Sequence, residues 1–205
     1  MTNTTKSEEC KRKLIEAAGQ IFATVGYEAA TVRQITERAE VNIASINYYF
    51  GDKQELYRTV LQTVTSSLVL QLRESCTAST PKQRLSQFVH TILRIKSQDE
   101  LTWAPLLMAR EINELNEQQS GFLVEAVRPL HRMAEQIVRD LVRDAAPEKI
   151  SLAASLLVAL CINRPHQQKL DQMLNNNLAL DCDLETAANL ISSFALAGIR
   201  GMCAQ

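Results

Sequence analysis

The stretch Thr31–Lys53 reads TVRQITERAEVNIASINYYFGDK and decides the fold. Thr31 and Gln34 have the spacing of a capping box, which predicts a short helix starting after Thr31. A break is predicted near Glu40, and Asn42 is expected to cap a second short helix. Two short helices joined by a turn of only a few residues have the spacing of a helix-turn-helix. The positions predicted to face inward are Val32, Ile35, Ala39, Ile46 and Phe50.

Helical patterns continue on both sides of this stretch. Upstream, a capping box at Thr5 and a glycine suited to a C-cap at Gly26 predict one helix between them. Downstream, Asp52 is expected to cap a long helix, which a polar break over residues 75–81 ends. Further helices are expected over residues 82–96, 103–115, 121–143 (kinked at Pro129), 150–162 (bent or ended at Pro165) and 183–204.

The composition agrees with a helical chain. Only 6 glycines and 5 prolines occur among 205 residues, which disfavours a turn-rich β fold. The sequence therefore predicts an all-α fold. An N-terminal three-helix helix-turn-helix domain over residues 1–51 is joined by a long helix to a C-terminal helical bundle over residues 52–205.

Charge and hydropathy limit the classes of function. The chain carries 22 Lys and Arg against 23 Asp and Glu, a net charge of −1, so binding to nucleic acid must come from a local surface. The longest nearly apolar stretch, residues 152–162, is far short of the ~20 residues of a membrane span. The N-terminus lacks the apolar core of a signal peptide. We expect a cytoplasmic protein with no membrane partner.

Neither a metal site nor a cofactor is expected. The five cysteines form no CxxC pair, so reduced thiols are the expectation and a redox sensor is the less favoured alternative. The three histidines do not stand at metal-ligand spacing with Cys, Asp or Glu. These residues are Cys10, Cys76, Cys161, Cys182, Cys203, His90, His131 and His166.

The Thr31–Lys53 stretch resembles the TetR family, whose signature is a helix-turn-helix that ends in an aromatic run followed by Gly and Lys. Upstream, Phe22, Gly26 and Tyr27 also match, and the specific likeness covers about the first 60 residues. The resemblance implies a bacterial DNA-binding transcriptional regulator. It places the DNA contacts on Thr31, Arg33, Asn42, Ala44, Ser45, Tyr48, Tyr49 and Lys53.

Two residues depart from the family pattern. Glu40 stands where the family usually has Gly in the turn, so this residue must adopt another turn or accept a positive φ. Asn47 stands where Tyr is common, so the target sequence is expected to differ from those of other members. Asn47 itself can pair bidentately with an adenine edge.

The size and chemistry of the side chains on the second helix also suit contact with DNA. Short side chains at Ala44 and Ser45 let a helix sit deep in the major groove, and Ala44 can touch a thymine methyl. Aromatic hydroxyls and a lysine suit phosphate contacts, which position a protein without specifying a sequence. Residues 1–62 hold eight basic and eight acidic residues, so non-specific affinity is expected to be weak. A basic face could still form from Lys11, Arg12, Lys13, Arg33 and Lys53.

The C-terminal region contains a candidate effector pocket. The segment LTWAPLLMARE (residues 101–111) groups apolar side chains with a few polar ones, the usual composition of a ligand site. The predicted lining is Trp103, Met108, Arg110, Glu111, Phe122 and His131. Plain core packing is the alternative for each residue. The MARE segment and the Val127–Pro129 step resemble the CecR-like subgroup of the family.

A homodimer is predicted from the last two helices. The helix over residues 150–162 is apolar nearly all the way round and needs a cover, and the last helix is rich in small residues that allow close approach. The predicted contacts are Leu156, Leu160, Ile191, Phe194, Ala195 and Gly198. Internal packing alone is the alternative.

The sequence favours a ligand-responsive repressor. A dimer would bind a palindromic operator in double-stranded DNA, and an unknown small-molecule effector would release it. Two alternatives remain open: an enzyme that uses the helical cavity, with Glu111 and His131 as first suspects, and a protein–protein adaptor on the same scaffold.

Overall fold

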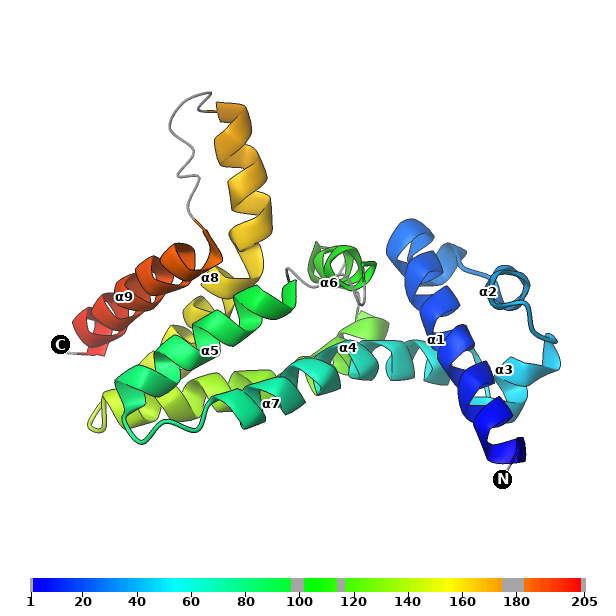
Figure 1. Ribbon diagram of the computed structural model, residues 1–205, viewed down its shortest axis with the longest axis horizontal. Coiled ribbons are helices and arrows are strands. Elements are labelled where there is room, and N and C mark those ends of the chain that lie inside the picture. The colour runs from blue at the N-terminus through cyan, green and yellow to red at the C-terminus, as the bar shows by residue number, and fades with distance from the viewer. Residues whose placement is uncertain (1, 97–101, 114–116, 175–182, 204–205) are drawn as a thin grey trace. The chain divides into compact units, whose positions relative to one another are not determined.

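The computed structural model describes residues 2–96, 102–113, 117–174 and 183–203, and the regular elements in these ranges are all α-helices (Figure 1). The chain forms two compact units, one from residues 1–67 and 99–127, the other from residues 68–98 and 128–205. The all-α prediction is confirmed. The boundary at residue 51 between a helix-turn-helix domain and the rest stays a prediction.

The first unit contains the helix-turn-helix. Its helices are α1 (Thr2–Ala29), α2 (Val32–Ala39), α3 (Ala44–Tyr49), the first part of α4 (Lys53–Ser75), α6 (Ala104–Asn113) and the first part of α7 (Glu117–Leu141). α1 packs against both α2 and α6. The core of the unit includes the fully buried Leu14, Phe22, Ile35, Ile46, Tyr57 and Leu107.

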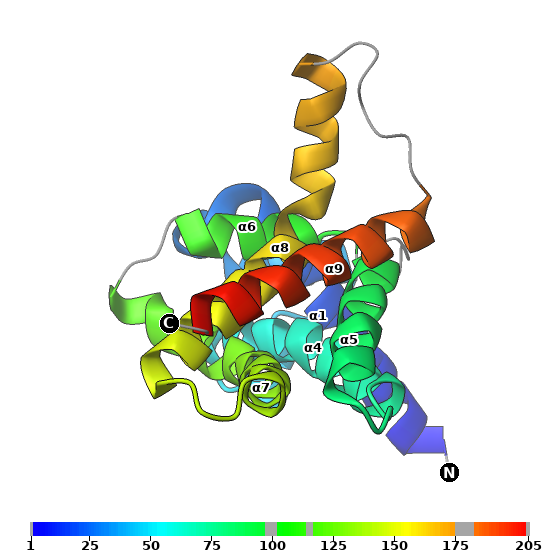
Figure 2. The same cartoon turned by 90° about the vertical axis from the view of Figure 1, so that its left-hand side faces the viewer.

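The second unit is a helical bundle. It combines the remainders of α4 and α7 with α5 (Pro81–Lys96), α8 (Pro147–Leu174) and α9 (Leu184–Cys203). α9 packs against α5 and α8 (Figure 2). Its core includes Leu72, Leu85, Phe88, Ile92 and Leu157. An ion pair of 2.5 Å between Arg84 Nη2 and Asp140 Oδ2 ties the start of α5 to the end of α7.

Local capping signals set several helix boundaries as predicted. The Thr31 hydroxyl accepts from the Gln34 backbone N–H, and the Gln34 side chain accepts from the Thr31 N–H, which completes the capping box. Asp52 accepts from the Glu55 N–H at 2.8 Å, and Asp183 accepts from the Thr186 N–H at 2.7 Å. Gly26 leaves the helical conformation inside α1, with φ 82° and ψ 168°.

Other boundaries differ from the predictions. α1 begins at Thr2 rather than Thr5. α8 runs past Pro165 to Leu174, so the predicted end near residue 162 was wrong, while the alternative of a helix that continues past Pro165 agrees with the structure. A proline removes one hydrogen bond and tilts the helix, yet a helix can continue beyond it, and the ribbon of α8 changes direction part-way along (Figures 1 and 2). The predicted helix ends at residues 115 and 204 lie outside the described residues.

Candidate nucleic-acid interface

The turn between α2 and α3 is held in a left-handed conformation. Glu40 has φ 55° and ψ 44°, and it is the one non-glycine residue with positive φ among those described. Its N–H bonds to the carbonyl of Glu37, and the Val41 N–H bonds to that of Thr36 at 3.0 Å. The turn therefore keeps the geometry that a glycine would give, at a steric cost that Glu40 bears.

α3 is anchored by one row of residues and presents another to solvent. Ile46 is fully buried in the core of the first unit, and Phe50 packs partly buried beside it. Ala44, Asn47 and Tyr48 are exposed, Tyr48 by 81%. The exposed row lies where a recognition helix needs its base-contacting groups.

Asn42 has a structural role at the start of α3. Its Oδ1 accepts a hydrogen bond of 2.9 Å from the Ala44 N–H, and its backbone carbonyl accepts from the Ser45 N–H. The side-chain amide NH2 is a separate donor that remains available for DNA. Ile43 occupies the N-cap position without a side-chain cap.

Lys53 holds the connection between α1 and α2. Its ammonium donates to the carbonyls of Tyr27 at 2.9 Å and Ala30 at 3.0 Å, and it lies 4.3 Å from the centre of the Tyr27 ring. An ammonium has three donors, so one is left for the predicted phosphate contact.

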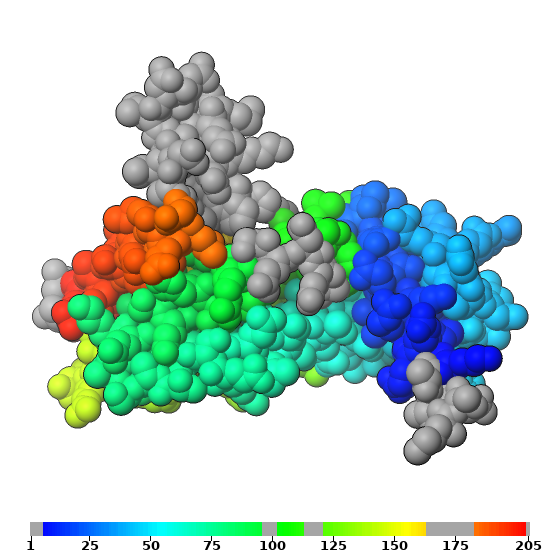
Figure 3. Space-filling model, viewed as in Figure 1, coloured from blue at the N-terminus to red at the C-terminus, as the bar shows by residue number. Residues whose placement is uncertain are grey.

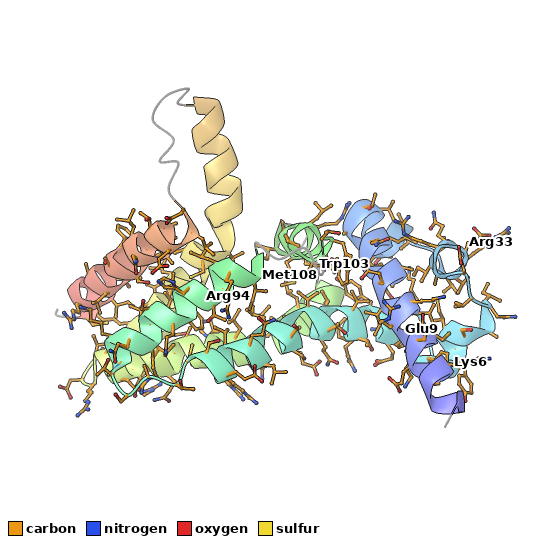
Figure 4. The ribbon with its side chains drawn as sticks, in the orientation of Figure 1. Lys6, Glu9, Arg33, Arg94, Trp103 and Met108 are labelled. Atoms are coloured by element: carbon orange, nitrogen blue, oxygen red, sulfur yellow. The ribbon has the colours of Figure 1, made fainter. Side chains whose placement is uncertain are left out.

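Arg33 projects from α2 into solvent (Figure 4) and pairs with Glu37 at 2.7 Å. An exposed i,i+4 pair contributes little to stability, so a phosphate could replace Glu37 at small cost. Lys11 lies 5.7 Å from the ring centre of Tyr49, one of the predicted phosphate contacts. Thr31 already bonds to Gln34, and Tyr49 already contacts Lys11. The contacts of Thr31 and Tyr49 with DNA stay predictions.

The sequence reading missed Ile43. Its side chain is 56% exposed at the start of α3, between two residues that were predicted to contact DNA. Its spacing could have predicted this exposure, because Ile43 stands four residues before Asn47 and therefore lies on the same face of the helix.

Trp103 and Arg110 link α6 to α1. A Cβ atom at Gly19 would lie 2.5 Å from three atoms of the Trp103 ring, so the indole packs closely against α1 at this residue. Trp103 and Met108 are labelled in Figure 4. Arg110 donates to the carbonyl of Thr24 at 3.0 Å, near Gly26, where α1 loses its regular hydrogen bonds. A cation at the C-terminal end of a helix is favourable.

The other predicted pocket residues divide between the two units. Met108 and Phe122 pack against the core of the first unit, and Glu111 is buried there. Burial, and then the Glu111 carboxylate, raise the pKa of the Tyr57 hydroxyl. His131 belongs to the second unit, with Nε2 at 2.9 Å from the Ser155 hydroxyl. The structure thus brings five of the six residues into one unit.

Two open hollows lie elsewhere, and none of the six predicted pocket residues lines them. One of about 400 Å³ lies between α1 and α2 and is lined by Arg12, Lys13, Glu16, Ala17, Gln20, Arg38, Ala39 and Glu40. The other, of about 540 Å³, is lined by Ser75, Gln87, His90, Thr91, Arg94, Asp183, Leu184 and Glu185. Each mixes acidic and basic side chains.

The predicted dimer residues lie partly at the surface. Phe194 is 68% exposed, and Leu156 and Gly198 are exposed as well. The surface of α9 is orange to red in Figure 3. Leu160 and Ile191 are half-buried against the core of their own unit. Ala195 is buried within that core.

Metal-ligating groups do not gather in the described part of the chain: no three His, Cys, Asp or Glu side chains there could hold an ion together. Among the described helices, none combines the length and apolarity needed to cross a bilayer.

Cys10, Cys76 and Cys203 are free thiols, and burial raises the pKa of Cys76 to about 11. Cys182 and the His166 side chain lie outside the described residues.

Two family models match the chain. The model for bacterial regulatory proteins of the tetR family matches residues 14–60. The model for the C-terminal domain of the HTH-type transcriptional dual regulator CecR matches residues 81–199. The first match covers α2, α3 and the turn between them, and the second covers most of the second unit together with α6.

Individual relatives agree with both models. CecR of Shigella flexneri is 41% identical over 70 residues, which cover 34% of this chain and 31% of that protein. The regulator TcmR of Streptomyces glaucescens is 26% identical over 147 residues, covering 72% of this chain and 64% of TcmR. The matched segments thus span less than two thirds of either relative.

Solved structures share the fold. FadR of Bacillus subtilis, in complex with stearoyl-CoA, has a TM-score of 0.73 at 15% identity, covering 91% of this chain and 98% of FadR. A TetR-like regulator from Rhodococcus sp. RHA1 has a TM-score of 0.68 at 19% identity, covering 94% and 96%.

Proposed function

Because the chain belongs to the TetR family of bacterial transcriptional regulators, with a C-terminal domain of the CecR type, we propose that it is a ligand-responsive repressor that binds a palindromic operator as a homodimer. The single observation that carries the proposal is α3, a recognition helix with a buried anchor at Ile46 and an exposed row of Ala44, Asn47 and Tyr48. The family consists of regulators, so the protein is not an enzyme. Its proposed target is chromosomal DNA, and we therefore propose that the protein acts in the cytoplasm.

The proposed dimer is formed by α8 and α9. These helices pack together within the second unit and carry exposed apolar side chains at Leu152, Leu156, Leu190 and Phe194. On α9, Leu190 and Phe194 are continued at helical spacing by the exposed Ala197, Gly198 and Gly201. Such a face is self-complementary across a two-fold axis, and pairing with a second copy gives a four-helix interface. A dimer also compensates for the weak charge of each binding unit, because two recognition helices engage one site together.

The proposed response runs from an effector through α6 to α1. Two observations support this route. The Trp103 ring, one residue before α6, packs closely against α1 at Gly19, so a shift of α6 is expected to be felt by α1. The buried Trp103 indole N–H has no acceptor among the described residues, which leaves a donor for a polar group of an effector. An effector that prefers one position of α6 then shifts the equilibrium between DNA-binding and released states.

The test of DNA binding is a selection from random duplex DNA with the purified full chain at two salt concentrations. A palindrome is expected, with half-sites one helical turn apart, about 34–36 Å, or a multiple of that. No enrichment at either concentration would contradict the proposal and favour the protein–protein adaptor. A reporter under the selected operator then gives the direction of control, since the relative CecR is named a dual regulator.

The test of the response uses the single tryptophan of the chain. Emission from Trp103 is recorded while candidate effectors are added to the protein bound to its operator. A true effector is expected to change the emission and to release the DNA over the same concentration range. Release without any change in emission would separate the effector site from α6.

A further inference from the structure

Ile43 combines an exposed side chain with a fixed position at the start of α3. Single exposed apolar residues are ordinary on a protein surface. Ile43 stands out because it lies on the face that also carries Ala44 and Asn47, and more than half of its surface is open. It is three residues before the buried Ile46, so it does not share that residue's anchoring role.

The backbone around Ile43 is well defined. Ile43 is helical, with φ −56° and ψ −33°. Asn42, just before Ile43, accepts hydrogen bonds from the N–H groups of Ala44 and Ser45, just after it, both at 2.9 Å. A β-branched side chain has few rotamers, so little further freedom is lost when its methyl groups meet a surface.

The exposed groups of α3 favour particular bases. The helix carries no Arg or Lys, the side chains that most often read guanine. Asn47 is suited to adenine, and the apolar Ile43 and Ala44 are suited to the one apolar feature of the major groove, the 5-methyl group of thymine.

We infer that Ile43 is a specificity-determining residue that reads thymine through its 5-methyl group in the major groove of each half-site. The inference rests on the proposed function, and it goes further by naming the residue and the chemical group that it reads. It also predicts half-sites with adjacent thymines, one for Ile43 and one for Ala44.

The test starts from the duplex obtained by selection. Each thymine of one half-site is replaced in turn, in both half-sites symmetrically, by deoxyuridine. This substitution removes the methyl group and keeps the base pair. At one thymine the wild-type protein is expected to lose about fourfold in affinity for each methyl removed, the factor that corresponds to ~0.8 kcal/mol for one buried methyl.

The variant Ile43→Ala ties this effect to the residue. At the same thymine, deoxyuridine is expected to change its affinity by less than twofold, whereas Ile43→Val keeps part of the effect. Leu70→Ala is the matched control, because Leu70 is 58% exposed on α4 and outside the first unit; it should keep the full effect. Thermal melts confirm that the variants fold.

The outcomes separate the inference from the proposed function. No selected duplex would overturn both. A selected palindrome that lacks thymine in its half-sites, that tolerates deoxyuridine at every thymine, or that responds equally with wild type and Ile43→Ala would overturn the inference alone.

Discussion

The indole ring of Trp103 lies against the backbone of Gly19, at the place where any other residue would carry its Cβ atom. The contact joins α6 to the middle of α1, and Arg110 adds a second link at the end of α1. A glycine in a helix interior normally costs stability relative to alanine. Here the missing Cβ is what lets the two helices approach each other.

Gly19→Ala is therefore expected to destabilise the protein, because the new methyl group collides with the Trp103 ring. An overpacked core costs about 1–3 kcal/mol, which urea denaturation would measure as a lower free energy of unfolding.

Gly121→Ala is the matched control for this substitution. Gly121 lies in α7 with open space where a Cβ would be, so it should gain up to ~1 kcal/mol from helix propensity. If both variants gained stability, the close approach of Trp103 would be refuted.

Glu40→Gly is expected to stabilise the first unit. A left-handed conformation costs an L-residue about 1–2 kcal/mol, while glycine loses more entropy on folding, roughly 0.5–1 kcal/mol. The net gain is up to about 1.5 kcal/mol, seen as a higher melting temperature. Glu40→Ala removes the same charge but not the strain and should stay near wild type. A gain in Glu40→Ala equal to that in Glu40→Gly would assign the effect to charge.

Lys53→Ala is expected to have two separate effects. Loss of two hydrogen bonds to the carbonyls of Tyr27 and Ala30 should cost about 1–3 kcal/mol of stability. Loss of a phosphate contact should weaken binding to all DNA sequences alike and reduce the salt slope by about one unit. Binding is measured by fluorescence anisotropy at several salt concentrations. A lower stability with an unchanged salt slope would leave Lys53 as a structural residue only.

Asn47→Ala should weaken binding to the selected operator by ~1–3 kcal/mol and relax the preference at one base pair. Asn47 is exposed on α3, so folding should be unaffected. The check is a second selection with the variant. An unchanged sequence preference would show that Asn47 does not read a base.

Phe194→Asp is expected to produce monomers. Across a two-fold axis each new carboxylate would be buried in an apolar interface that also contains its copy, which is unfavourable. Sedimentation velocity measures the change, and operator affinity should fall with it. Leu70→Asp, at a leucine of α4 that is 58% exposed against 68% for Phe194, serves as the control. A dimer that survives Phe194→Asp would contradict the proposed interface.

The sequence predicted the helix-turn-helix well because its signals are local. A capping box needs only Thr31 and Gln34, and the buried anchor Ile46 follows from helical spacing. The family pattern, with glycine at the position of Glu40, left two outcomes open, another turn or a positive φ, and the structure has the positive φ.

The contacts of α6 could not be predicted in the same way. Trp103 and Gly19 are far apart in sequence, and no pattern in either segment predicts that the two residues are in contact. The sequence also left open whether α8 bends or ends at Pro165, since a proline signals a break locally while packing and neighbouring hydrogen bonds decide whether the helix continues. Ala195 was predicted to contact a second copy because it is a small residue on α9, but its side of that helix faces the core of its own unit.

The first unit is assembled from two separate stretches of the chain, residues 1–67 and 99–127. A ribosome that adds about 5–20 residues per second needs about 3–12 s to pass from residue 67 to residue 127. During that interval the recognition helix exists, but the segment that covers α1 has not yet been made. A nascent chain therefore cannot complete the first unit before it has synthesised α6.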